Sequence, residues 1–97
     1  MAYVLVADGI ITQEQYEESI RRLTEGSRER MESPDDWPVP GLLSHTAGQG
    51  PNGFRVVDVW ESREALEQFG AVLMPVLADV GVQGEPEIYE AHTYVSA

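Results

Sequence analysis

The chain has 97 residues, which predicts one domain over 1–97, and its hydrophobic share of 42% is too high for a disordered segment. Its formal net charge is −11 and all six basic residues are arginines, so neither nucleic acid nor an anionic membrane surface is expected as a partner. It contains no cysteine, which excludes disulfides, thiolate nucleophiles and cysteine-ligated metals.

The first predicted element is a strand over residues 3–7, YVLVA. These residues are apolar and suit a strand, and the Asp8-Gly9 turn signal follows them. The run is much shorter than the roughly 18 apolar residues of a membrane-spanning helix. It also lacks the basic start and long apolar region of a signal peptide, so we expect a soluble, cytoplasmic protein.

A helix is predicted next, beginning at a capping box formed by Thr12 and Gln15. Glutamates come early in it and arginines late, an order that complements the helix dipole. Its narrow inner stripe recurs at spacings of three and four and consists of Tyr16, Ile20, Leu23, Ser27 and Met31. We expect the helix to end near Glu32, because Ser33-Pro34 disfavours its continuation.

The middle of the chain predicts a loop at 33–41, stiffened by three prolines, and then a hairpin. Strands are expected at 42–47 and 54–60, and the Asn52-Gly53 pair between them is typical of a hairpin connection. The glycine-rich stretch 48–53 does not read as a phosphate loop, because no helix follows it and such loops use a helix N-terminus.

The remaining residues predict a second helix and a last strand. Ser62 can cap the helix, apolar residues then recur at helical spacing, and Gly81 closes it. Pro75 falls inside this helix, so a kink or a split into two half-helices is expected. Residues 87–95 predict the final strand.

The predicted order βαββαβ indicates an α+β, ferredoxin-like fold. Two βαβ halves with right-handed crossovers give a four-stranded antiparallel sheet with both helices on one face. Both faces of the strand at 54–60 have apolar centres. Phe54, Val56, Asp58 and Trp60 share one face, and Arg55, Val57, Val59 and Glu61 share the other. The face away from the helices needs a cover, and a homodimer that stacks two sheets would supply it.

Three stretches make this chain similar to a known family: GFRVVDVWESREALEQF at 53–69, LMPVL at 73–77 and EIYEAH at 87–92. With the βαββαβ order, they resemble the dimeric α/β-barrel superfamily, and most closely its antibiotic-biosynthesis-monooxygenase-like (ABM-like) proteins. The resemblance implies a barrel-forming homodimer with a small-molecule pocket between sheet and helices. Its members include cofactor-free oxygenases of electron-rich aromatic polyketides, haem-degrading enzymes and isomerases, and the fold does not decide among them.

The haem-degrading members can be compared with this chain position by position. They carry a tryptophan that Trp60 matches, a histidine on the second helix and an asparagine on the first strand. Here the helix reads Gln68-Phe69-Gly70 and the strand YVLVA has no asparagine, so haem binding of that kind is not expected. We predict no cofactor. The oxygenases share the Trp60 match, but their asparagine is absent here too, which places oxygen chemistry of the known type in question.

Asp58 is the main catalytic candidate, because a carboxyl group in a largely apolar pocket can serve as a general base or acid. The alternatives are a structural carboxylate that is hydrogen-bonded to a side chain of a neighbouring strand, and a carboxylate that is exposed at a sheet edge. His45 is the second candidate. If positions across the hairpin sum to 101, Leu43 opposes Asp58 and His45 opposes Val56, on the Asp58 face. A His–Asp pair would then form a proton shuttle, whereas a one-residue slip would turn His45 away.

Four aromatic residues are candidates for binding a substrate, each with core packing as the alternative: Trp60, Phe54, Phe69 and Trp37. Trp37 lies in the proline-stiffened loop and could act as a lid. His92 shares one face of the predicted last strand with Glu90. His45, His92 and a carboxylate lack tight ligand spacing, so no metal site is expected.

The sequence supports three functions. The first is a cofactor-independent enzyme, either a monooxygenase or a cyclase or isomerase, acting on an aromatic or polyketide-like metabolite. The second is a non-catalytic homodimer that binds a small hydrophobic ligand or stabilises a partner enzyme. The third is a structural dimerisation unit. Nucleophilic hydrolysis has no support, because a GxSxG motif is absent.

Overall fold

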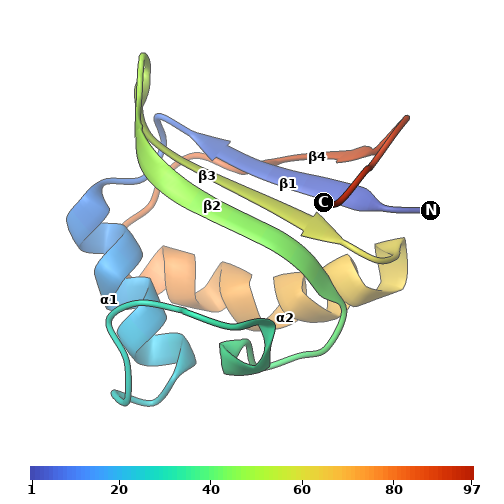
Figure 1. Ribbon diagram of the computed structural model, residues 1–97. Coiled ribbons are helices and arrows are strands. Elements are labelled where there is room, and N and C mark those ends of the chain that lie inside the picture. The colour runs from blue at the N-terminus through green and yellow to red at the C-terminus, as the bar shows by residue number, and fades with distance from the viewer.

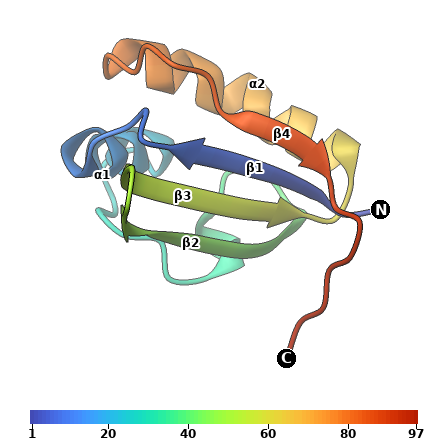
Figure 2. The same cartoon turned by 90° about the horizontal axis from the view of Figure 1, so that it is seen from above.

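A computed structural model of all 97 residues shows a four-stranded antiparallel sheet with two helices against one of its faces (Figure 1). The elements follow in the order β1 (Tyr3–Asp8), α1 (Gln13–Leu23), the short 3-10 helix η1 (Pro34–Asp36), β2 (Leu42–Gly50), β3 (Gly53–Trp60), α2 (Arg63–Asp79) and β4 (Glu87–Glu90). The strand order is β2-β3-β1-β4, which Figure 2 shows from above. The ferredoxin-like fold predicted from the sequence is confirmed.

Helix α1 begins as predicted but ends nine residues earlier than Glu32, at Leu23. The Thr12 hydroxyl accepts from the Gln15 backbone N–H, and the Gln15 side chain accepts from the Thr12 backbone N–H. Glu25 and Gly26 then adopt left-handed φ angles of 55° and 85°, which stop the helix. The predicted end near Glu32 was therefore wrong, because Gly26 supplies an earlier stop than Ser33-Pro34.

Helix α2 runs without a break from Arg63 to Asp79, along the length of the sheet (Figure 1). Its cap is Ser62, whose hydroxyl accepts from the Ala65 backbone N–H. Pro75 lies inside the helix on its exposed side, where water can satisfy the carbonyl that the proline leaves without a partner. The predicted split into two half-helices does not occur.

The hairpin between β2 and β3 sets the register that positions the candidate site. Its turn consists of Pro51 and Asn52, and Gly50 pairs with Gly53. Paired positions therefore sum to 103 and not to 101, so His45 lies directly opposite Asp58. The register that was considered from the sequence, in which Leu43 opposes Asp58, does not occur. The error is two residues, which is one full period of the strand, so the predicted face of His45 is correct.

Strand β4 is shorter than the predicted run of 87–95 and ends at Glu90. Residues 92–97 form no helix or strand, and His92 is exposed among them. Strands β2 and β4 are the two edges of the sheet. None of the helices is long and apolar enough to cross a membrane.

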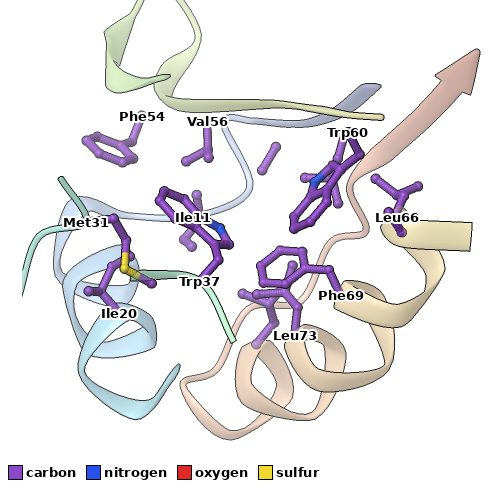
Figure 3. Packing of buried hydrophobic residues seen from close by; sticks show 14 residues of the cluster. Ile11, Ile20, Met31, Trp37, Phe54, Val56, Trp60, Leu66, Phe69 and Leu73 are labelled. Atoms are coloured by element: carbon purple, nitrogen blue, oxygen red, sulfur yellow. The ribbon is translucent and has the colours of Figure 1, made fainter. Parts of the chain in front are cut away.

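The main hydrophobic core fills the space between the sheet and the helices (Figure 3). The even-numbered residues of β3 face this core, and among them Asp58 is buried together with its apolar neighbours. A second, smaller group of apolar residues lies on the other face of the sheet, around the buried side chains of Val4 and Val6. Val57 and Val59 pack there while half-exposed.

Candidate functional site

The centre of the candidate site is a hydrogen bond between His45 on β2 and Asp58 on β3. The His45 Nδ1 atom lies 2.5 Å from the Asp58 Oδ1 atom. The Asp58 side chain is 4% exposed and the His45 side chain 14%. A carboxylate in its ionised form can only accept, and with Asp58 in that form the proton of this bond is assigned to His45 Nδ1.

Tyr16 extends this pair into a chain of three side chains. Its hydroxyl oxygen lies 2.6 Å from the other ring nitrogen of His45, Nε2. In a neutral imidazole protonated at Nδ1, Nε2 is an acceptor, so the Tyr16 hydroxyl donates to it. We call Tyr16, His45 and Asp58 the relay. One helix and two strands contribute to it. The two hydrogen bonds together fix the tautomer of the His45 ring.

Aromatic rings hold the relay in place. The Tyr16 ring stacks on the His45 ring, with centroids 5.9 Å apart and an interplanar angle of 13°. The Trp37 ring meets His45 edge-on at 4.7 Å. Trp37 is buried and its indole points into the centre of the core (Figure 3). These contacts restrict the imidazole to the orientation in which both of its nitrogens are bonded.

The loop that carries Trp37 is fixed by Asp36. The Asp36 Oδ2 atom accepts from the backbone N–H groups of Glu32 and Ser33, at 2.8 and 3.0 Å. Oδ1 pairs with Arg28 at 3.2 Å. These contacts, the Glu32 N–H first among them, lower the pKa of the Asp36 carboxyl. The carboxylate therefore holds together the backbone that leads into Trp37.

Two hollows meet at the relay. The first is a cavity of about 50 Å³ between the sheet and the helices, and thirteen of its seventeen lining residues are hydrophobic. All three residues of the relay line it, with Trp37 and Phe69. A water molecule takes up about 30 Å³ in the liquid. The cavity in this structure therefore has room for only one or two small molecules of that size.

The second hollow is an open groove of about 450 Å³, bounded by α1, the loop after it and the hairpin. We call it the groove, and it is lined by Gln13, Tyr16, Glu17, Glu29, Arg30, Met31, His45, Ala47, Gly48, Gln49 and Phe54. Tyr16 and His45 line both the groove and the cavity, whereas Asp58 lines only the cavity. The relay therefore connects an exposed polar groove to a buried carboxylate.

The structure separates the four aromatic residues predicted to bind a substrate. Phe69 and Trp37 line the cavity and Phe54 lines the groove. Trp60 lines neither: it is 0% exposed and stacks on Phe69 with ring centroids 4.8 Å apart (Figure 3). Its indole nitrogen is buried without a hydrogen-bond partner. In this structure Trp60 supports the wall that Phe69 forms and does not reach either hollow.

His92 is not part of this constellation, because it is exposed and lies beyond the end of β4. No group of three histidine, cysteine, aspartate or glutamate side chains is placed so that it could hold a metal ion.

Tyr16 was not among the candidates predicted from the sequence, which placed it only on the inner stripe of the helix. A signal was nevertheless present: a buried tyrosine hydroxyl needs a hydrogen-bond partner, and Tyr16 is the one tyrosine on that stripe. The sequence alone could not name His45 as the partner, because residues 29 positions apart meet only through the tertiary fold.

Burial, and after it the charge of Asp58, raises the pKa of Tyr16 to about 12. A phenol with a pKa of about 12 is only about 1% ionised at pH 10, where an ordinary tyrosine is half ionised. We expect the tyrosinate absorbance of wild-type protein minus that of Tyr16→Phe to be near zero at pH 10 and to rise only above pH 11. A half-maximal difference at pH 10, with the fold intact by circular dichroism, would contradict this.

The same shift predicts how stability responds to alkali. The pKa of Tyr16 is higher in the folded protein than in the unfolded chain, so folding favours the protonated phenol. This contribution is fully present below about pH 10 and is lost as the pH rises from about 10 to about 12. Tyr16→Phe should therefore lose less stability than wild type over that interval in urea unfolding.

Comparison with known proteins finds similarity at the level of three-dimensional structure. No protein-family model and no curated protein matches the chain. A crystal structure of a protein provisionally named an antibiotic biosynthesis monooxygenase, from Chloroflexus aurantiacus J-10-fl, superimposes with a TM-score of 0.53 at 20% identity. The match covers 99% of this chain and 98% of that one.

A second solved structure gives a similar result. It is a monooxygenase from the gene ActVA-Orf6 of Streptomyces coelicolor, in complex with the ligand nanaomycin D. The TM-score is 0.50 at 21% identity, and the match covers 99% of this chain and 91% of that one. The chain therefore has the fold of these antibiotic-biosynthesis-monooxygenase-like structures over nearly its whole length.

Proposed function

We propose that this protein is a small enzyme that acts on an aromatic or polyketide-like metabolite by first removing a proton from it. The observation that carries the proposal is the relay, which joins the buried Asp58 through His45 to Tyr16 at the groove. A histidine oriented by a carboxylate on one nitrogen and bonded to a hydroxyl on the other has the arrangement of a general base. The same fold occurs in a monooxygenase that binds nanaomycin D and in a protein provisionally named an antibiotic biosynthesis monooxygenase, which supports a small-molecule substrate.

The proton moves in two coupled transfers. A substrate hydroxyl or activated C–H group gives its proton to the Tyr16 oxygen while the Tyr16 hydroxyl proton passes to His45 Nε2. The tyrosine ends as it began, and the imidazolium that forms is stabilised by Asp58. Because burial raises the pKa of Tyr16, a free tyrosinate is disfavoured and the two transfers should be concerted.

The anion left in the groove has two outcomes. Return of the proton to a carbon atom gives an isomer or closes a ring, and the relay is restored. Alternatively, the anion is electron-rich enough to react with dioxygen. A CH₂ group between aromatic rings then becomes a carbonyl with release of water, CH₂ + O₂ → C=O + H₂O, and the substrate itself supplies the electrons. No cofactor is required for either outcome.

The groove is the proposed site for the body of the substrate. Small-molecule sites commonly have volumes of about 300–1,000 Å³, and the groove has about 450 Å³ against about 50 Å³ for the cavity. Phe54 offers an aromatic face in the groove and packs against Tyr16 at 5.2 Å. Phe69 and Trp37 would contact only a substituent that enters the cavity.

The proposal is tested with 1,3-dihydroxynaphthalene, a hydroxyaromatic compound whose ring C–H groups exchange with solvent through its keto form. Wild-type protein should accelerate deuterium exchange in D₂O, followed by proton NMR, and Tyr16→Phe should lower that acceleration by about 10². Tyr94→Phe, an exposed tyrosine beyond the end of β4, is the matched control. Oxygen uptake in the same sample would identify a monooxygenase, and exchange without uptake an isomerase.

Exchange in Tyr16→Phe at the wild-type rate would remove Tyr16 from the mechanism. The small volume of the cavity beside Asp58 supports a second candidate, a homodimer that binds its ligand without transforming it. Nanaomycin D, the ligand of the Streptomyces coelicolor monooxygenase, is the binding probe for that candidate. A thermal shift with nanaomycin D, combined with neither exchange nor oxygen uptake, would favour binding over catalysis.

A homodimer is part of this proposal, with the sheet face opposite the helices as its interface. That face carries the half-exposed Val57 and Val59 and, on β4, Tyr89 at 50% exposure. The occupant we propose is a second copy of this chain. A two-fold axis would place the same valines on both sides, and the apolar centres of the two faces would bury each other.

Val59→Glu should break this dimer, because it places a charge from each subunit in a dry interface. Wild-type protein is expected to have twice the chain mass of 10.7 kDa in analytical ultracentrifugation, and the variant one chain mass. Val72→Glu, on the exposed face of α2 at 39% exposure, is the control and should remain dimeric. A wild-type mass of one chain would contradict the dimer.

A further inference from the structure

We propose that Arg30 is the anion-binding residue of the groove and that the substrate carries, or acquires on deprotonation, an oxyanion that pairs with it. The ligand class is therefore a planar organic acid: an aromatic molecule with a carboxylate, phenolate or enolate oxygen. The inference deepens the proposed function, on which it rests only for the claim that the groove receives the substrate.

The first observation is that Arg30 is the one arginine of the chain without a carboxylate partner. The other five are each paired, as Arg21 with Glu18 and Glu29, Arg22 with Glu18 and Asp79, Arg28 with Glu32 and Asp36, Arg55 with Asp8, and Arg63 with Glu67. In a chain with seventeen acidic residues and six arginines, a partner for every arginine is available. The guanidinium of Arg30 is left free to bind something else.

The second observation is the place of Arg30. It lines the groove together with Tyr16 and His45, the two residues of the relay that reach the groove. Its charge acts on Tyr16: burial is the main cause of the raised pKa of Tyr16, and Arg30 opposes that rise. Arg30 and Tyr16 therefore line the same groove, where one bound ligand can meet both side chains.

The chemistry of the relay calls for a cation at this position. When Tyr16 and His45 remove a proton from a neutral substrate, negative charge develops on the substrate oxygen. A positive charge that meets this oxygen stabilises the transition state more than the ground state. A guanidinium also offers two parallel N–H donors, which match the two oxygens of a carboxylate. Arg30 can therefore pair with a carboxylate that the ligand already carries or with an oxyanion that forms when the ligand loses a proton.

Two acidic residues in the groove limit what the site accepts. Glu29 is occupied by Arg21 at 3.1 Å, and Glu17 accepts a hydrogen bond from the Gln13 amide at 3.4 Å. Both carboxyl groups line the groove. A second anionic group on the ligand would be repelled there, so the site should select an organic monoanion over a dianion.

The test uses salicylate and its neutral analogue salicylamide, each titrated into ¹⁵N-labelled protein and followed by NMR. Salicylate should bind the wild-type groove more tightly than salicylamide. Arg30→Gln should weaken salicylate binding about tenfold and leave salicylamide unchanged. Glu17→Gln should tighten salicylate binding, because it removes a like charge. Arg63→Gln, an exposed arginine on α2, is the matched control and should bind salicylate as wild type does.

Three results would overturn the inference: no binding of salicylate to wild type, equal affinity for salicylate and salicylamide, or unchanged salicylate affinity in Arg30→Gln. Arg30 is exposed and its side chain forms no hydrogen bond within the chain, so the variant should fold. The measurement is of binding alone, and its outcome is independent of deuterium exchange. A failed exchange assay with intact Arg30-dependent binding would refute the enzyme and leave the anion site standing.

Discussion

Asp58→Asn should lower turnover of 1,3-dihydroxynaphthalene by about 10²–10⁴-fold while leaving the protein folded. Asparagine has the shape of aspartate and can still accept the hydrogen bond from His45 Nδ1. It cannot stabilise the imidazolium that forms when His45 takes the proton, and its amide can instead donate to Nδ1, which would select the wrong tautomer. The loss should therefore appear in the rate, with little change in the urea midpoint.

Two further variants make this prediction specific. Asp8→Asn changes another partly buried acid of the sheet, which pairs with Arg55 at 2.9 Å and lies outside the relay. It should keep the wild-type rate. The double variant of Asp58→Asn with His45→Gln should lose no more than the larger single loss, because the residues act as one unit. Unfolding of Asp58→Asn would instead show that Asp58 is structural.

The second large effect is expected at Trp60, on stability. Trp60→Ala should lower the free energy of unfolding by about 3–5 kcal/mol, because removal of this fully buried side chain leaves a cavity. Trp60→Phe should cost clearly less than Trp60→Ala, because the smaller change in volume leaves a smaller cavity. Phenylalanine fills much of the same space against Phe69, and it removes an indole N–H that is buried without a partner. Guanidinium unfolding of the three proteins measures both values.

The same pair of variants tests what Trp60 does. In this structure it touches neither the cavity nor the groove, so Trp60→Phe should keep the wild-type rate of exchange. A loss of rate without a loss of stability would mean that Trp60 reaches the substrate after all. Equal destabilisation by phenylalanine and alanine would mean that the indole N–H has a partner that the structure does not reveal.

The order and type of the main elements could be predicted from the sequence because they depend on local chemistry. Thr12 and Ser62 act as caps through atoms three residues away, and both do so in the structure. The errors were made where local signals compete. Gly26 ends α1 before Ser33-Pro34 can, and an exposed Pro75 is tolerated inside α2. Where a helix or strand ends depends on which of several nearby stop signals acts first. The spacing of apolar residues does not show this.

The site was predicted in part, and the parts differ in physical origin. Asp58 stood out because a carboxylate on an apolar strand face needs a partner. Side chains alternate between the two faces along a strand, so a change of two residues in register keeps His45 on the same face as Asp58. The direct pairing depends on the turn at Pro51-Asn52, which sets the register of the whole hairpin. No local pattern in the sequence indicates that Tyr16 bonds to His45 or that Arg30 lines the groove.

The sequence by itself therefore determined the βαββαβ order, the two faces of β3 and the place of Asp58 on an apolar face, because alternation, helical spacing and capping act between near neighbours. Only the tertiary structure decided that Tyr16, His45 and Asp58 form one chain of hydrogen bonds, and that Arg30 stands unpaired beside it. Those contacts join residues 13 and 29 positions apart. Their geometry depends on strand register and on where α1 packs, which are properties of the whole fold.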